Sequence, residues 1–262
     1  DQSVGLMLGQ SIDSGLLLTP LAPELRGLPE QPGWSEMVRS IRVRAAPAQE
    51  AADGFAQARY DLILGGRLAH LPLASTGPLS RGNVRLDAAL GLFGLDVRRA
   101  EGFLGSAANR EALSMAIDRQ GLMQPFNIGG WVASTRIVPV ALSTMLVAPT
   151  ERWAALSLDQ RRSEARQRVS RWRSESGQEP EVRLYLPPGP GSDMMFEGLA
   201  ADFAAIGVSA TRADKSSAAD LALRDRVARY ASPRWFLNQF NCDVSARQCS
   251  EDADYLVSLA LD

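Results

Sequence analysis

The feature that most constrains the fold is an apolar stripe in residues 109–119, Asn-Arg-Glu-Ala-Leu-Ser-Met-Ala-Ile-Asp-Arg. Leu113, Ala116 and Ile117 recur at i, i+3 and i+4, so they share one face of a helix, whereas the charged side chains lie largely off that face. Asp118 can then cap a second short helix, because a carboxylate accepts the free N–H groups of a first turn. We therefore predict a helix that packs against a sheet, a capped corner and a short second helix.

Elsewhere the order strand, helix, strand occurs twice, first over residues 40–64 and again over residues 181–212. In each case an alternating or apolar run precedes a helical pattern and a second run follows it. Such units favour parallel pairing of the strands and an α/β fold. A further helix is predicted from Ser157, its N-cap, to about residue 174. The predicted strands are residues 40–44 and 60–64 around a helix at 48–58, and residues 181–186 and 208–212 around a helix at 194–205.

The composition excludes several classes of protein. The 262 residues are 45% hydrophobic and 22% charged, which allows one large core or two modest ones. The net charge of -2 argues against nucleic acid or an anionic membrane surface as a main partner. No apolar run approaches the roughly 20 residues of a membrane helix. The arginines between residues 161 and 173 are interleaved with Glu164, which predicts a solvated helix face.

The sequence carries no enzyme signature. His70 is the single histidine, and neither Gly-x-Ser-x-Gly nor the glycine patterns that bind nucleotides occur. One histidine and two cysteines, Cys242 and Cys249, make a poor set of ligands for a transition metal. We therefore expect that the protein is not an enzyme and that it uses no cofactor or metal.

The apolar helix resembles a segment of a known family. Arg110-Glu-Ala-Leu-x-x-Ala-Ile-Asp-Arg119, followed by Gly129-Gly130 and Pro139, is similar to the "R-x-A-L-x-x-A-I-D-R" segment and its Gly/Pro continuation in solute-binding protein family 5. These are the peptide-, dipeptide- and nickel-binding proteins of bacterial ABC importers.

Three further segments carry the same resemblance. Residues 55–63 match the family's "G-x-x-D-h-h" segment, except that Ala58 stands where glycine is usual. Residues 91–96 look like the strand that crosses between the lobes of such proteins, and residues 199–208 resemble the "L-x-x-I-G-h" segment of the second lobe.

The resemblance implies an α/β fold of the two-lobed, periplasmic binding protein-like kind (type II). Family members have a longer N-terminal portion and a C-terminal return into the first lobe, so the chain is interpreted as a fragment with the first lobe incomplete and the second lobe mostly present. The predicted domains are residues 1–100, a partial first lobe with the βαβ unit and the crossover strand, and residues 101–262, the second α/β lobe. Gly91 and Gly94 of the crossover strand fit either a hinge or close backbone packing.

The most informative candidate site is residues 225–238, where a strand end and a turn would place side chains at the rim of an α/β lobe. This segment resembles the family's "W-x-x-D-Y-x-x-P-x-x-F-L-N". In the peptide-binding members the backbone of this segment pairs with the ligand, and its Asp holds the α-ammonium group of the ligand. The ligand-binding residues that the resemblance implies here are Arg226, Val227, Arg229, Tyr230 and Trp235.

The departures from the family pattern bear on the ligand. Arg229 stands at the Asp position, and Arg226 stands at the Trp position. A guanidinium group repels an ammonium group and prefers a carboxylate or phosphate. We therefore expect an anionic or neutral ligand rather than a free peptide N-terminus. The alternative is that both arginines are solvated on an exposed edge.

The two cysteines enclose six residues. Cys242 and Cys249 can form a disulfide if their Cα atoms come within about 7 Å, and an even pair in a periplasmic protein would oxidise. The alternative is two buried free thiols. Both alternatives are structural rather than catalytic.

Together these inferences predict an extracytoplasmic solute-binding component of an ABC importer, which binds a peptide-like or other small solute between two lobes and delivers it to the membrane permease. The alternative is a ligand-sensing domain of the same fold attached to a transcriptional regulator. The expected partners are the small-molecule or peptide ligand and the ABC transporter permease, with no nucleic acid, and we expect a monomer. The expected location is periplasmic, with or without a lipid anchor, although no signal sequence is visible in this chain.

Overall fold

The computed structural model describes residues 2–4, 7–13, 15–74, 84–86, 89–129, 131–142, 150–244 and 249–259. The chain divides into two units, Asp1–Gly65 and Gly66–Asp262. The predicted lobes, residues 1–100 and residues 101–262, remain a prediction. The crossover strand β5 (Gly91–Val97) belongs to the second unit, because it pairs along its whole length with β8 (Leu221–Val227).

The first unit contains an antiparallel sheet with the strand order β1-β2-β3-β4. Its strands are β1 (Gln2–Val4), β2 (Met7–Ile12), β3 (Gly15–Pro20) and β4 (Ile41–Val43). Its helices are the 3-10 helix η1 (Pro23–Arg26), α1 (Trp34–Met37) and α2 (Ala48–Ala56).

The βαβ unit predicted over residues 40–64 is not observed. β4 and α2 occupy the places of the predicted first strand and helix, but β4 pairs antiparallel with β3, and residues 60–64 form no strand. No strand of the described residues pairs with this segment, so its backbone groups have no ladder to join. The side chains of Leu62 and Leu64 are exposed as a result.

Ala58, the residue at the family's usual glycine position, has a left-handed backbone conformation. Its φ is +54°, and its N–H donates to the carbonyl oxygen of Phe55 at 3.0 Å just after α2. Glycine is favoured in this region because a Cβ approaches the following carbonyl oxygen too closely. The left-handed backbone conformation of this turn therefore explains why glycine is usual at this position of the family pattern.

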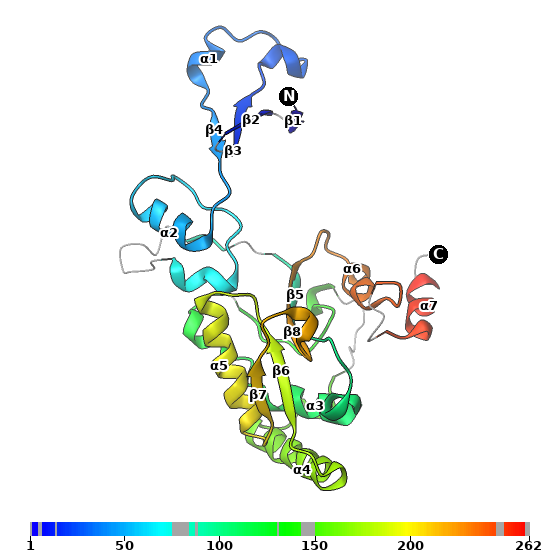
Figure 1. Cartoon of the computed structure of the whole chain (residues 1–262). Coiled ribbons are helices and arrows are strands. Elements are labelled where there is room, and N and C mark those ends of the chain that lie inside the picture. The colour runs from blue at the N-terminus through cyan, green and yellow to red at the C-terminus, as the bar shows by residue number, and fades with distance from the viewer. Residues whose placement is uncertain are drawn as a thin grey trace. The chain divides into compact units, whose positions relative to one another are not determined.

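The second unit is built on a mixed sheet with the strand order β5-β8-β6-β7. β5 and β8 are antiparallel, whereas β6 (Glu181–Tyr185) pairs in parallel with both β8 and β7 (Ser209–Arg212). Between β6 and β7 the chain forms α5 (Pro190–Ala204), which lies alongside β7 in Figure 1. The strand, helix and strand predicted over residues 181–212 are therefore observed.

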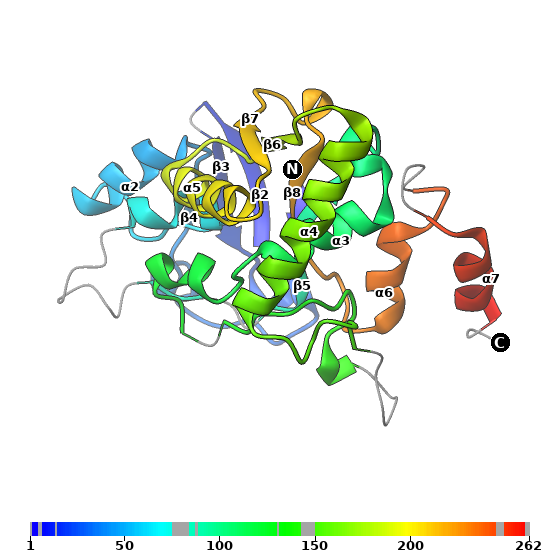
Figure 2. The same ribbon diagram turned by 90° about the horizontal axis from the view of Figure 1, so that it is seen from below.

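The predicted apolar helix is α3 (Ala107–Ala116). Its main neighbour is α4 (Leu158–Ser176), which runs beside it in Figure 2, rather than the sheet as predicted. Alanines on both helices are fully buried, and such small side chains let two helix backbones approach closely. Ile117 follows the end of α3 and is only partly buried. The α3 side chains in the apolar core are Ala112, Leu113, Met115 and Ala116.

Two helix starts follow the sequence signals. Ser157 caps α4 in a capping box, in which Ser157 Oγ accepts the N–H of Gln160 at 3.3 Å and Gln160 Oε1 accepts the N–H of Ser157 at 2.9 Å. At the corner after α3, Asp118 Oδ1 accepts the N–H of Gly121 at 3.0 Å, where the 3-10 helix η4 (Gly121–Phe126) begins. The capped corner predicted at Asp118 is therefore present.

Two arginines of α4 are not solvated, contrary to the prediction for this basic helix. Arg162 donates to the carbonyl oxygen of Ala116 at 3.1 Å and pairs with Asp202 of α5. Arg168 pairs with Glu111 of α3, and its hydrogen bond lowers the pKa of the Glu111 carboxyl. The arginines of α4 therefore connect α3 and α5, because these two helices present carboxylates and a free carbonyl group toward them.

The remaining helices are short. They are η2 (Leu68–Leu73), η3 (Gly102–Gly105), η5 (Val140–Leu142), η6 (Ser216–Ala218), α6 (Pro233–Leu237), η7 (Asn238–Phe240) and α7 (Glu251–Leu259). Among the described helices, none has the length and apolar character required to cross a membrane.

Candidate functional site

The candidate segment forms a strand end, a turn and a short helix, as predicted. The ladder between β8 and β5 continues one step past β8, where the N–H of Ala228 donates to the carbonyl oxygen of Leu90 at 2.8 Å. Ser232 then caps α6, because its Oγ accepts the N–H of Arg234 at 3.3 Å. Pro233 occupies the first turn of α6, where its missing N–H removes no helical hydrogen bond.

Asp220 fixes the start of β8 against β6. Its carboxylate accepts the backbone N–H of Arg183 at 2.9 Å and the guanidinium group of the same residue at 2.8 and 3.1 Å. Burial alone would raise the pKa of Asp220, but these hydrogen bonds and the charges of Arg183 and Arg99 outweigh it and lower the pKa below its usual value. The ionised carboxylate therefore holds the strand that carries the candidate residues.

Close packing explains one of the two glycines in β5. Gly91 lies opposite Val227, and a Cβ at Gly91 would lie 2.4 Å from the carbonyl oxygen of Arg226. A Cβ at Gly94 would meet no atom within 4 Å. The close approach of the β8 backbone therefore requires a glycine at residue 91.

The structure separates the five predicted ligand-binding residues into two groups. Arg226, Val227, Arg229 and Tyr230 are exposed, with Val227 at 65% and Tyr230 at 51% of full exposure. Trp235 is only 7% exposed, and its ring meets the edge of the Phe236 ring with 5.0 Å between centroids. The four exposed residues can meet a ligand, whereas Trp235 packs inside the unit.

Gln239 connects the buried Trp235 to the arginines of β8. Its Nε2 donates to the carbonyl oxygen of Trp235 at 3.1 Å, and its Oε1 accepts Nη1 of Arg226 at 2.8 Å. Its carbonyl oxygen accepts Nη1 of Arg224 at 3.2 Å, while Nη2 of Arg224 donates to Asp96 Oδ2 at 2.9 Å. Gln239 therefore orients two neighbouring guanidinium groups.

Sequence reasoning missed Arg224, Gln239 and Asp96. One signal was available, because Arg224 and Arg226 are two residues apart in a strand and so lie on the same face of the sheet. The partner carboxylate was not visible, since Asp96 lies 128 residues earlier in the chain.

A pocket of about 240 Å³ opens beside these residues. Charged side chains dominate its lining, with guanidinium groups outnumbering carboxylates. Within the ranges that the structure describes, no group of three or more His, Cys, Asp or Glu side chains could hold a metal ion. The charged residues that line the pocket are Arg67, Arg98, Arg224, Arg226, Asp96 and Asp225.

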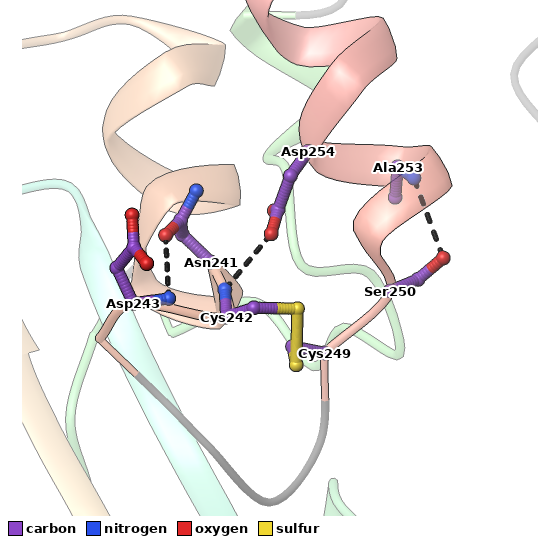
Figure 3. The surroundings of a disulfide bond; sticks show 7 residues. All are labelled: Asn241, Cys242, Asp243, Cys249, Ser250, Ala253 and Asp254. Atoms are coloured by element: carbon purple, nitrogen blue, oxygen red, sulfur yellow. Dashed lines mark hydrogen bonds between the residues drawn. A yellow bond between two sulfur atoms is a disulfide. The ribbon is translucent and has the colours of Figure 1, made fainter.

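A disulfide joins Cys242 and Cys249 in the structure, with 5.0 Å between their Cα atoms (Figure 3). The N–H of Cys242 donates to Asp254 Oδ2 at 2.9 Å, and Asp254 belongs to α7. The bond and this hydrogen bond attach α7 to the end of the candidate segment. The sequence left open either a disulfide or two free thiols, and the structure contains the disulfide.

We expect the Cys242–Cys249 bond to form in protein matured in an oxidising compartment. Peptide mass spectrometry without reduction should detect the linked peptides, and replacing both cysteines by serine should lower the free energy of unfolding by about 2 to 3 kcal/mol, because the closed loop is short. A reducing agent should destabilise the wild type and leave the double variant unchanged. Two alkylatable thiols in such material would contradict the prediction.

No protein-family model and no curated protein sequence matches the chain. Solved structures do match it, and the fold that it shares with them is that of the peptide-binding proteins associated with ABC transporters, which have two lobes. The resemblance to solute-binding protein family 5 is therefore confirmed at the level of the fold.

Three of these structures show the extent of the similarity. OppA of Burkholderia pseudomallei matches with a TM-score of 0.71 and 16% identity over 98% of this chain and 53% of its own. OppA of Haemophilus influenzae, solved with the peptide RPPGFSPFR, has a TM-score of 0.68 and 12% identity over 98% and 52%. The periplasmic binding protein DppA of Helicobacter pylori, solved with the peptide STSA, has a TM-score of 0.63 and 15% identity over 98% and 51%. The chain spans about half the length of each.

Proposed function

We propose that the protein is a solute-binding component of an ABC importer. The observation that carries this proposal is the similarity of fold, which extends over 98% of the chain in each of the three structures described above. Two of them were solved with bound peptides. The same similarity supports a periplasmic location and delivery of the solute to a membrane permease.

The ligand of this protein is proposed to be anionic. Arg229 stands where the peptide-binding pattern has the Asp that holds an ammonium group, and Arg229 is exposed in the turn after β8. In the described part of the chain no carboxylate pairs with the Arg229 guanidinium group. An exposed guanidinium group favours a carboxylate or phosphate on the solute and repels a free peptide N-terminus.

We expect Arg229→Asp to reverse this preference. A charge-assisted hydrogen bond contributes about 1.5 to 3 kcal/mol, so affinity for the preferred anionic solute should fall roughly tenfold to a hundredfold. Isothermal titration calorimetry of the protein would compare a panel of anionic solutes with unmodified peptides before and after the substitution. The panel should contain dicarboxylates, phosphorylated small molecules and peptides with blocked N-termini.

The matched control is Arg234→Asp, which makes the same charge change at an exposed arginine of α6 in the same segment. It should leave the affinity within about twofold of the wild type, because a screened charge outside the site contributes little. Tight binding of free-amine peptides by the wild type would refute the anionic ligand. Binding of no solute of either kind would refute the solute-binding role itself.

A further inference from the structure

The pocket beside β8 has an excess of positive charge. Four guanidinium groups and two carboxylates line it, so cationic side chains outnumber anionic ones in the lining. Asp96 accepts from Arg224 at 2.9 Å and from Arg98 at 3.4 Å, so one carboxylate serves two cations. Asp225 lies 3.9 Å from Arg67, too far for a hydrogen bond.

Two arginines of the pocket, Arg224 and Arg226, are held in place before any ligand binds. Arg224 is fixed by Asp96, by the carbonyl oxygen of Gln239 and by the ring of Phe240, whose centroid lies 5.0 Å from the guanidinium carbon. Arg226 is oriented by the side chain of Gln239 at 2.8 Å. Orientation in advance reduces the entropy lost when a ligand binds, so these groups can favour an anion more than freely moving side chains would.

The size of the pocket limits what it can hold. About 240 Å³ is less than the roughly 300 Å³ at the lower end of drug-sized ligand sites. A carboxylate or phosphate group on a short carbon chain fits such a volume, and both match the planar fork of a guanidinium group.

We propose that this pocket is an oxyanion site, which binds the carboxylate or phosphate group of a small solute through Arg226, Arg224 and Arg67. This inference deepens the proposed function. It rests on that function for one point, namely that the bound anion is the transported solute. Gln239 is the positioning residue of the site, because it holds both β8 arginines through separate oxygen atoms.

The test is an NMR titration of the ¹⁵N-labelled chain with inorganic phosphate and, separately, with succinate. Sodium chloride keeps the ionic strength constant. We expect saturable shifts of the arginine Nε–H signals and of the β8 amide signals. Tighter binding of phosphate would indicate a phosphate site, and tighter binding of succinate would indicate a dicarboxylate site. Arg226→Gln should weaken binding about tenfold through the loss of one charge-assisted contact.

Two further variants keep the test decisive. Asp225→Asn removes a carboxylate that competes for Arg67 and should tighten binding severalfold, so the two pocket variants act in opposite directions. Arg234→Gln removes an exposed arginine outside the pocket lining and should change nothing. Shifts that do not saturate, or equal weakening by Arg226→Gln and Arg234→Gln, would overturn the proposal. If the pocket binds neither anion while the protein still binds an anionic solute in calorimetry, this inference fails and the proposed function stands.

Discussion

Replacing Phe203 by alanine is expected to lower the free energy of unfolding of the second unit by about 3 to 5 kcal/mol. Phe203 lies on α5 and has no exposed surface (0%). It belongs to the same buried cluster as Val182 and Leu184 of β6. The alanine would remove this apolar surface and leave a cavity that a close-packed core fills only partly. Urea denaturation followed by circular dichroism would measure the loss.

Phe196 provides a matched control on the same helix. It is partly buried beside the guanidinium group of Arg212, so Phe196→Ala should remove less buried surface and have a clearly smaller effect. Equal effects of the two substitutions, or a change below about 1 kcal/mol at Phe203, would mean that α5 does not depend on this core contact.

The elements that the sequence predicted correctly carry their own local signals. Ser157 and Gln160 form a capping box whose two hydrogen bonds lie within one turn, so no distant residue is needed to start α4. Three residues after α5, Gly207 has a φ of +84°, a left-handed conformation that glycine adopts readily where a helix ends. Periodicity and end signals together were sufficient for these helices.

The predictions that failed depended on partners that the pattern does not contain. The apolar residues 60–64 suit a buried strand, but pairing requires a neighbouring strand, and none is present among the described residues. Arg162 and Arg168 look solvated on a helix rich in charge. Their partners Asp202 and Glu111 lie 40 and 57 residues away and are brought close only by packing.

In the candidate site too, features set by local sequence were predictable and features set by distant contacts were not. The strand end, the turn at Ser232 and Pro233 and the short helix after it follow from local order. The burial of Trp235 could not be predicted, because its fractional exposure depends on how α6 packs in the fold. Gln239 had no signal in the sequence, since its role consists of contacts with residues on a separate element.

The second large effect is expected at the buried pair of Arg162 and Asp202, whose side chains are 21% and 12% exposed. Asp202 Oδ2 also accepts the N–H of Asp118 at 2.9 Å, so the pair connects α4, α5 and the corner after α3. Arg162→Met would leave a buried carboxylate without its cation, which destabilises a protein by about 3 to 5 kcal/mol at neutral pH. Urea denaturation at pH 7 would measure the change.

The effect should depend on pH with a definite sign. Burial already raises the pKa of Asp202 above its ordinary value, although the N–H of Asp118 and the charge of Arg162 oppose it. Removal of Arg162 should raise this pKa further. A carboxyl group whose pKa is higher in the folded state binds its proton more tightly there, so its contribution to stability falls as the pH rises from about 4 through the folded pKa. The variant should therefore recover stability between pH 7 and pH 5 relative to the wild type.

Two comparisons separate this interpretation from a general loss of packing. The double variant Arg162→Met with Asp202→Leu leaves no buried charge and should recover most of the lost stability at pH 7. Arg212→Met breaks an ion pair with Asp193 that is far more exposed, so it should change the free energy of unfolding by about 1 kcal/mol or less. A double variant as unstable as Arg162→Met, with no recovery at pH 5, would show that the guanidinium group acts through its volume and its hydrogen bond to Ala116 rather than through its charge.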